Sequence, residues 1–511
     1  MDRIVAAEHA LRRFRDDFYR CLERRADALF ERTDAILAAG PQPSFAYLRL
    51  AAPHRRGWGR LYAALREGRI DTDRRRALLG RHAPDADQPE YAVECSVWPR
   101  GEAETSAERG YYYHPSHHLD GQPIVKGWSY QWIVQLGFAR DSWTAPADVQ
   151  RVQPWHGATE VAVEQVRALV RRRGAASAAP VFVFDAGYDV TALTHARLDE
   201  PVNLLVRLRR DRCFYGPPPV VRARTGRPRR NGAKFRCDDP ATWPAPTAEH
   251  ACEDAQYGTV TVQAWAGLHP VVRSPLGERT YERRPHVTGI VIRVTVTRHA
   301  GRARTPLELW LWWQGPDAPN RDRVWRSYFR RYDIAQTFRF LKQALNWATP
   351  QIRTPAQADR WTWLVAVAYS QLRLARAALP DQRRPWQRAQ SAGAFTPVRA
   401  QRGFSTLLLA LGTPADAPKP CGRSPGRPNW TPPDSPAAHP RSSARAATSG
   451  GIPAPRPPRG AEGVESGDRP LLLYSLRWLV AACNHDPQTQ RGHHRRYCTR
   501  PGWGGGHTEH A

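Results

Sequence analysis

The sequence predicts an α/β fold with a β-rich insertion, a helical N-terminal region and a disordered C-terminal tail, and three observations support the α/β domain. The stretch APVFVFDAGYDV at 179–190 is an almost continuous apolar run that ends in an acid, as a strand buried on both faces does. A helical pattern at 158–173 precedes it, and a second strand-like run follows at 203–208. Such alternation of strands and helices is typical of an α/β sheet.

The first 85 residues form the predicted N-terminal helical region. Residues 10–37 contain no Pro or Gly, and their apolar side chains recur mainly at intervals of three, four or seven, as in an amphipathic helix. A further helix is expected over 59–67. The pattern is equally compatible with a nucleic-acid-binding domain and with a helical support for the α/β domain.

The predicted α/β domain covers 86–412. Its early strands are the β-branched stretch 91–98 and the alternating stretch 130–138, and a helix with an apolar face is expected over 356–379. Between the acid-ending strand and the last helices lie three more strand-like segments, namely 258–266, 288–297 and 307–313. These segments predict a β-rich insertion over about 210–318.

The composition changes after residue 412. Residues 414–458 hold 13 of the 46 prolines, so this part of the chain has too little apolar surface to build a core. We therefore expect residues 413–511 to form a mostly disordered tail.

The charge of the chain predicts a polyanionic partner. With 76 basic and 48 acidic side chains the formal net charge is +28, and nucleic acid is the usual partner of such an excess, with a membrane surface as the alternative. No apolar run reaches 18 residues, and the first 20 residues are charged throughout. A cytoplasmic, nucleoid-associated protein is therefore expected.

The stretch YFRRYDIAQTFRFLK at 328–342 combines helical spacing with polar side chains. Tyr328, Arg331, Ala335 and Lys342 follow one another at intervals of three, four and seven, which places all four on one face of a helix. An ordinary basic amphipathic helix would show the same spacing, so the interpretation depends on other motifs.

Carboxylates at strand ends are the second chemical signal. Cleavage of a phosphodiester is commonly catalysed by two divalent ions about 4 Å apart, and Mg²⁺ prefers carboxylate oxygens. Asp185 closes the buried run VFVFD, and Glu94 lies in the strand-like stretch YAVECSVW. These two acids are the candidate metal ligands.

Several longer motifs make a family resemblance specific. They are HRRGWGRLYAALREGRID at 54–71, KGWSYQW at 126–132, VFDAGYDV at 183–190, the TGRPRR loop and IRTPAQADRWTWL at 352–364. Together with the signature Tyr-x2-Arg-x3-Glu-x6-Lys, they resemble the DDE transposases of bacterial insertion sequences, in particular an actinobacterial group. The resemblance covers about residues 10–430.

The resemblance implies an RNase H-like catalytic domain with a β-rich insertion before the last acid. It also implies binding of double-stranded DNA at transposon ends and target, and cleavage and strand transfer with two Mg²⁺ or Mn²⁺ ions. A homodimer is a separate expectation, which the sequence itself does not show. Carried over residue by residue, the catalytic positions are Glu94, Asp185 and Ala335, and the metal ligands among them are Glu94 and Asp185.

Two of these three positions depart from the family pattern. Ala335 offers no ligand where the family has glutamate, and Glu94 has one methylene more than aspartate, which moves its carboxylate by about 1.5 Å. Asp333 lies about 200° around the helix from Ala335 and faces elsewhere, while Asp189 has the position of a helix-start residue. Impaired cleavage is therefore expected, and the alternative is an inactive DNA-binding protein on a transposase scaffold.

Basic side chains for DNA are expected in two places. The loop 207–234 is rich in Arg, Gly and Pro, and it could follow a phosphate backbone or simply be solvated. The candidate DNA-binding residues are Arg207, Arg209, Arg210, Arg227, Arg229, Arg230 and Lys234 in this loop, with Tyr328, Arg331, Arg339 and Lys342 on the helix.

Overall fold

The computed structural model describes residues 2–419 except for 43, 115–121, 140, 175–177, 197–200, 219–229, 272–285, 299–306 and 392. The tail predicted to be disordered therefore lies outside the described residues, apart from 413–419.

The described residues form helices α1 (Asp2–Arg20), α2 (Ala26–Ala39), α3 (Trp58–Glu67), α4 (Thr72–Arg81), α5 (Ala158–Arg173), α6 (Val190–His195), α7 (Arg321–Arg330), α8 (Tyr332–Gln343), α9 (Pro355–Ala375) and α10 (Pro397–Leu411). Their strands are β1 (Leu22–Arg24), β2 (Arg69–Ile70), β3 (Glu90–Pro99), β4 (Gly110–Tyr113), β5 (Ile124–Leu136), β6 (Thr144–Val152), β7 (Val181–Phe184), β8 (Asn203–Leu208), β9 (Cys213–Tyr215), β10 (Lys234–Arg236), β11 (Ala248–Asp254), β12 (Gly258–Pro270), β13 (Gly289–Val296) and β14 (Leu307–Gln314). Two short 3-10 helices, η1 (Phe45–Leu50) and η2 (Pro240–Thr242), complete them.

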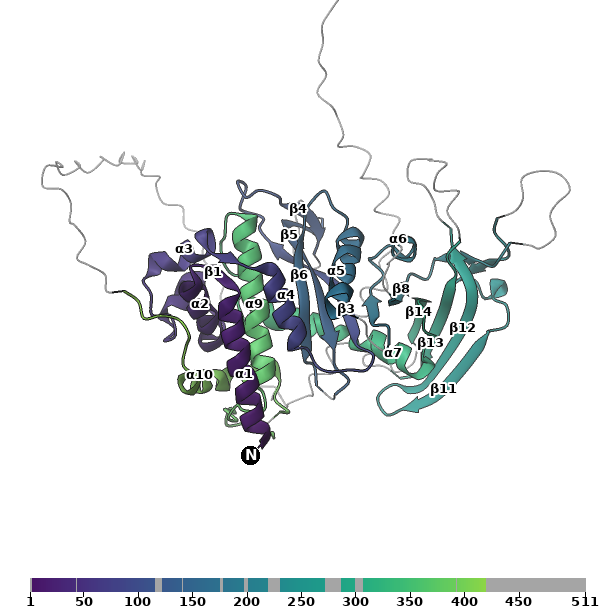
Figure 1. The fold of residues 1–511 in the computed structure, drawn as a ribbon. Coiled ribbons are helices and arrows are strands. Elements are labelled where there is room, and N and C mark those ends of the chain that lie inside the picture. The colour runs from purple at the N-terminus through teal and green to yellow at the C-terminus, as the bar shows by residue number, and fades with distance from the viewer. Residues whose placement is uncertain are drawn as a thin grey trace, which may run out of the picture.

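One large mixed sheet organises the molecule (Figure 1). Its strands follow the order β10-β9-β12-β13-β14-β8-β7-β3-β5-β4, with β6 beside β5 and β11 beside β12. The central neighbours β3, β7 and β8 are parallel, whereas β5 and β6 run antiparallel to their partners. The insertion strands extend this same sheet because β14 pairs with β8. A mixed α/β fold of this kind is consistent with an RNase H-like domain.

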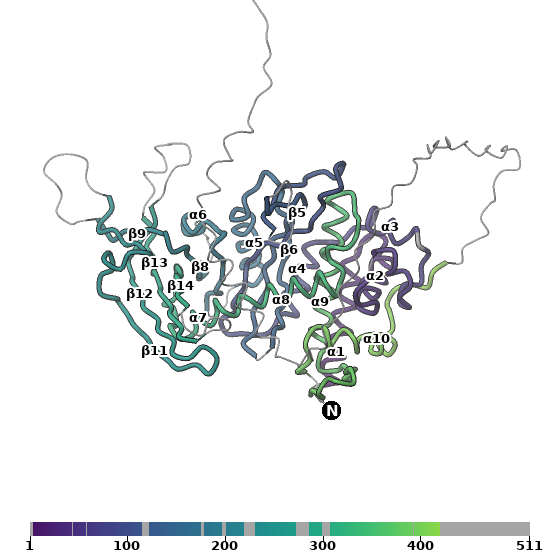
Figure 2. The backbone as a smooth tube through the Cα atoms, turned by 180° about the vertical axis from the view of Figure 1, so that it is seen from behind, coloured from purple at the N-terminus to yellow at the C-terminus, as the bar shows by residue number. Residues whose placement is uncertain are grey.

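Helices cover both faces of the sheet. The pleat of β3 sends Tyr91 and Val93 to the face covered by α5 and α6, and Ala92 and Trp98 to the opposite face. That opposite face is covered by α8 and α9, while α4 contacts β6 directly and the helices α1, α2 and α3 pack against α9 (Figures 1 and 2). Each face therefore has its own hydrophobic core.

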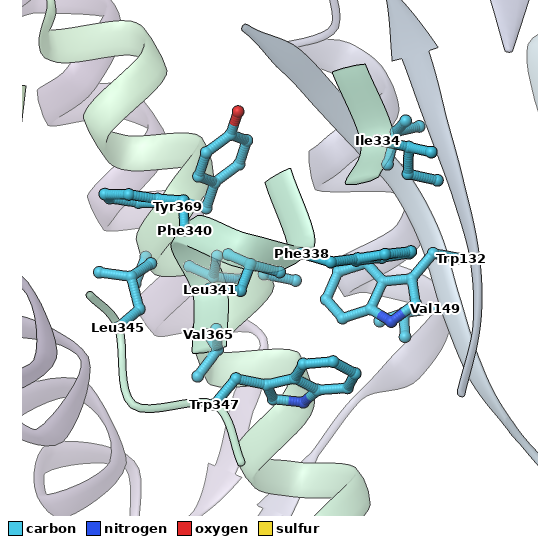
Figure 3. Close-up of a cluster of buried hydrophobic side chains, with 14 of the residues drawn as sticks. Trp132, Val149, Ile334, Phe338, Phe340, Leu341, Leu345, Trp347, Val365 and Tyr369 are labelled. Carbon is cyan, nitrogen blue, oxygen red and sulfur yellow. The ribbon is translucent and has the colours of Figure 1, made fainter. Parts of the chain in front are cut away.

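Aromatic side chains hold α8 against the sheet (Figure 3). Trp132 of β5 lies edge-on to Phe338 of α8, with ring centroids 5.9 Å apart, and to Trp347, at 5.4 Å. Trp132 and Trp347 are fully buried, and such edge-to-face pairs add to the free energy gained by burial. The packing leaves α8 fixed over β3 and β5.

The N-terminal helices share a core with the rest of the chain. Arg15 of α1 forms a buried bidentate ion pair with Asp34 of α2, at 2.6 and 2.9 Å, and also donates to Gln371 of α9 at 2.8 Å. Apolar side chains of α1 and α2 belong to the same buried cluster as α9 and α10. The domain boundary near residue 85 remains a prediction.

The single helix expected over 10–37 is wrong, because α1 and α2 are separate. Between them β1 pairs with β2, and Arg25 adopts a left-handed conformation with φ of 59°. A left-handed residue ends the helical path, and it is rare outside Gly, Asn and Asp. The sequence pattern does not reveal this pairing, since β2 lies more than 40 residues away.

Two further expectations need correction, and one helix was not predicted. The helix expected over 328–342 is two helices, α7 and α8, joined at Arg331, where the Ile334 N–H donates to the Arg331 carbonyl in a tighter i+3 bond. The stretch expected as a loop over 207–234 contains β9 and begins β10, which pair with each other. Helix α10 was not expected. Helix 158–173 and strand 203–208 are confirmed.

Among the described residues, no helix has the length and apolar character needed to cross a membrane.

Candidate active site

The register of two parallel strands brings the two candidate acids together. In the pairing of β3 with β7, Val93 lies opposite Phe184, so Glu94 and Asp185 occupy the next pair of positions. Val183 and Ala92 point to the face covered by α8, and by the two-residue period of a strand Asp185 and Glu94 point to it too. Both carboxylates therefore lie at the carboxyl ends of the strands, beneath α8.

Arg331 joins these carboxylates. Its Nη1 donates to Oε2 of Glu94 at 2.8 Å, and its Nη2 lies 3.9 Å from Oδ2 of Asp185. The guanidinium is mostly buried, whereas the Asp185 side chain is about one-third exposed. One cation thus lies against both acids, hydrogen-bonded to Glu94 and at a longer distance from Asp185.

Ala335 lies on the helix face that looks toward Glu94. It is about 20° around the axis of α8 from Lys342, and the side chains of Lys342 and of Arg331, which precedes the helix, both interact electrostatically with Glu94. Helix α8 also contacts β3 directly. The position to which the resemblance assigns the third acid therefore lies on the helix that covers the acid pair, and it carries only a methyl group.

Arg207 and Tyr328 flank the pair. Because Phe184 pairs with Val206, Arg207 occupies the position beside Asp185 on β8. The guanidinium of Arg207 lies 5.8 Å from the centre of the Tyr328 ring, and that of Arg331 lies 5.6 Å from the same centre. Tyr328 therefore lies between two cations in a cation–π arrangement.

Burial shifts the pKa values of the ionisable side chains at the acid pair. Burial raises the pKa of Glu94 to about 7, although Arg331 opposes the rise and Asp185 adds to it. Burial also lowers the pKa of Lys342 to about 8, against the influence of Glu94. For Arg331 burial acts to lower the pKa, but Glu94, Tyr328 and Asp185 hold the pKa above its usual value. Arg331 therefore remains the fixed charge of the site.

Gly187 and Asp189 shape the loop that follows Asp185. The Gly187 N–H donates to Oδ1 of Asp185 at 2.5 Å, and a side chain at Gly187 would begin 2.9 Å from that oxygen. Asp189 instead caps α6 by accepting from the N–H groups of Thr191 and Ala192. The prediction that Asp189 starts a helix is confirmed.

Asp333 is turned away from the acid pair, as predicted. It forms a 2.9 Å ion pair with Arg330 and is 9% exposed. Burial raises the pKa of Asp333 to about 7, with Arg330 opposing and Asp141 contributing to the rise. Asp333 therefore does not replace the missing acid at Ala335.

The raised pKa of Asp333 predicts a pH-dependent stability. The pKa of Asp333 is 3.8 in the unfolded chain and about 7 in the folded one. The contribution of its protonated form to the free energy of unfolding is therefore fully present below about pH 4 and is lost as pH rises through 7. Relative to an Asp333→Asn variant, the natural chain should lose free energy of unfolding between pH 4 and 7, by up to ~1.4 kcal/mol per pH unit. Urea unfolding at a series of pH values measures this, and a pH-independent difference would refute it.

The acid pair offers fewer ligands than a two-metal cluster needs. Glu94 and Asp185 supply two carboxylates, Ala335 supplies none, and the Arg331 guanidinium already occupies an oxygen of Glu94. Within the described residues, groups of three possible ligand side chains do not include this pair. A two-ion cluster therefore does not fit the residues present.

The predicted DNA-binding residues fall in different places. Four lie at the acid pair, namely Arg207, Tyr328, Arg331 and Lys342. Four are exposed, namely Arg209, Arg210, Lys234 and Arg339. Arg230 is partly buried, and Arg227 and Arg229 lie outside the described residues.

Sequence reasoning missed the ion pairs of Arg331 with Glu94 and Asp185. It placed Arg331 on the correct helix face but assigned it only to DNA. The helical spacing combined with the strand order could have indicated these ion pairs. A cation on the helix face that covers the sheet lies near the acids at the strand ends.

Comparison with known families supports a DDE transposase-type family. A family model described as DDE superfamily endonuclease matches residues 17–270, just under half of the chain. The match includes Glu94 and Asp185 and ends before α8. No curated protein matched the chain. DDE endonucleases act on DNA and typically use divalent metal ions.

Proposed function

We propose that the chain is a transposase-family protein of a bacterial insertion sequence that binds the DNA ends of its element and is impaired in cleavage and strand transfer. The main support for this proposal is the strand register, which sets Glu94 beside Asp185 beneath α8. Support also comes from the match to DDE endonucleases, which have transposase or nuclease activity.

The roles within this proposal follow from the contacts. Glu94 and Asp185 are the remaining acids of the site, and Arg331 holds them together while no ion is bound. Arg207 and Lys342 bring positive charge to the same face, where a DNA phosphate would be attracted. Ala335 leaves the set one carboxylate short, so the second of two ions would lack a ligand.

The alternative is a DNA-binding protein without chemistry. The direct ion pair between Arg331 and Glu94 favours it, because a guanidinium at 2.8 Å neutralises a carboxylate that the family uses for metal. The two candidates differ in one assay. Slow, Mn²⁺-dependent cleavage of DNA carrying the element's ends supports an impaired transposase, and its complete absence supports the binding protein.

DNA binding itself is expected to be strong and salt-sensitive. Each neutralised phosphate releases counterions, so log K falls with log salt with a slope of about −0.9 per contact. Replacing Arg227, Arg229 and Arg230 together by Ala should weaken binding and reduce the slope by up to about 3. Fluorescence anisotropy on duplex DNA at several salt concentrations measures both quantities.

A matched control removes the same charge elsewhere. Arg383, Arg384 and Arg388 are three exposed arginines in the segment between α9 and α10. Their replacement by Ala should leave the slope nearly unchanged. If both triple variants change the slope equally, the basic loop has no specific part in binding and only the net charge matters.

Homodimerisation and a cytoplasmic, nucleoid-associated location belong to the same proposal. They depend on the family resemblance and on the net charge of +28.

A further inference from the structure

A group of metal-binding side chains lies apart from the acid pair, between the insertion and α7. His250 and Cys252 are on β11, and Asp322 is in the first turn of α7. Each offers one ligand atom, and these atoms all lie within 4.8 Å of one another. The residues come from segments about 70 positions apart, so the fold alone brings them together.

The backbone explains why the three side chains converge. Side chains of β11 alternate between partly buried and exposed, and His250, Cys252 and Asp254 are on the partly buried side that meets α7. Among the strands that the structure describes, β11 pairs with β12 alone. At the start of α7, Asn320 caps the helix by accepting from the Asp322 N–H, which fixes that residue.

The separations come close to those of a tetrahedral zinc site. Zn–S and Zn–O or Zn–N bonds of about 2.3 and about 2.0 Å give ligand atoms about 3.3–3.6 Å apart at tetrahedral angles. Here Sγ of Cys252 lies 3.6 Å from Oδ1 of Asp322, and Nε2 of His250 lies 4.0 Å from the same oxygen. Small rotations of the side chains would close the remaining gap.

The surroundings support such an ion. Nε2 of His250 is buried and has no hydrogen-bond partner among the described residues, which leaves its lone pair available. Arg326 donates to both oxygens of Asp322, at 3.3 and 3.4 Å, and to Asp254 at 2.8 Å. A ligating carboxylate is commonly held by such an outer hydrogen bond, and Asp254 offsets the charge of Arg326.

We propose that His250, Cys252 and Asp322 bind a zinc-class divalent ion that joins β11 of the insertion to α7. A Cys, His and carboxylate set suits zinc better than Mg²⁺, which prefers oxygen ligands. Binding releases the proton of the Cys252 thiol, and the fourth position is left for water. The ion would anchor the start of α7. Arg331 follows Asp322 by nine residues, which is about 13 Å along the helix.

Cobalt and zinc titrations of the full chain test the site. Co²⁺ added to reduced, metal-free protein should give the near-ultraviolet charge-transfer band of a thiolate ligand, and Zn²⁺ should displace it. Cys252→Ser should abolish the band and His250→Ala should weaken Co²⁺ binding at least tenfold. Cys213→Ser on β9 is the matched control and should leave the band unchanged. A band of undiminished intensity in Cys252→Ser overturns the proposal.

Alkylation of the natural chain provides a second measurement that requires no variant. Zn²⁺ should slow the reaction of iodoacetamide with Cys252 at least tenfold, as followed by mass spectrometry of its peptide, and should not slow the reaction of Cys213. An unchanged rate at Cys252 with saturating Zn²⁺ contradicts the site even if other cysteines of the chain bind metal.

Discussion

Ala335→Glu is expected to raise the rate of DNA cleavage at least a hundredfold over the natural chain. The substitution adds a third carboxylate to a helix face that already looks toward Glu94 and Asp185. Stabilisation of a leaving oxygen by a metal ion contributes several kcal/mol, and each ~1.4 kcal/mol is a factor of ten in rate. The assay uses DNA carrying the element's ends, with Mg²⁺ or Mn²⁺.

A second substitution and a control sharpen this result. Ala335→Glu combined with Glu94→Asp should cleave faster still, because sites of this kind tolerate only about 0.5 Å of misplacement, and the two positions share one cluster. Gln336→Glu adds the same charge about 100° around the helix and should leave the rate unchanged. Equal activation by Ala335→Glu and Gln336→Glu would show that added charge, rather than a metal ligand, is responsible.

Arg32→Met is expected to stabilise the fold by about 2–4 kcal/mol. Arg32 of α2 is fully buried, and its guanidinium nitrogens have no hydrogen-bond partner among the described residues. Its guanidinium lies 5.2 Å from the centre of the Phe45 ring, and burial lowers the pKa of Arg32 to about 9, although Tyr62 opposes the shift. A buried, unpaired cation is costly, whereas Met fills a similar volume without charge.

Denaturant unfolding of both chains measures the difference in free energy. Arg24→Met serves as the control, because Arg24 is exposed on β1 and its replacement should change stability by less than about 0.5 kcal/mol. A destabilised Arg32→Met variant would mean that Arg32 has an acceptor in solution that offsets its burial.

The acid pair was predictable from the sequence because its signals are local. The run VFVFD shows a buried strand ending in an acid, and the spacing of Ala335 and Lys342 places both on one face of α8. The same spacing does not reveal that Tyr328 belongs to a separate helix, α7. Helix α5 and strand β8 also have strong local patterns, and they occur where they were expected. The prediction of a β-rich insertion follows from the same kind of local pattern. That its strands join the main sheet through β14 could not be predicted from such patterns.

The remaining features depend on contacts between distant segments. Arg25 breaks the N-terminal helix because β1 pairs with β2, and no local pattern announces that pairing. The ion pair of Arg331 with Glu94 joins positions 237 residues apart. Likewise, His250 and Cys252 can be recognised as candidate ligands only in the folded chain, where Asp322 lies beside them.

The central claim is that Glu94, Asp185 and the face of α8 that carries Ala335 form one DDE-type site. The most direct test is the dependence of restored cleavage on Asp185. In the Ala335→Glu, Glu94→Asp background, adding Asp185→Asn should return the cleavage rate to the background level while DNA binding is unchanged. Restored cleavage that persists without the Asp185 carboxylate would contradict the account and place the chemistry elsewhere in the chain.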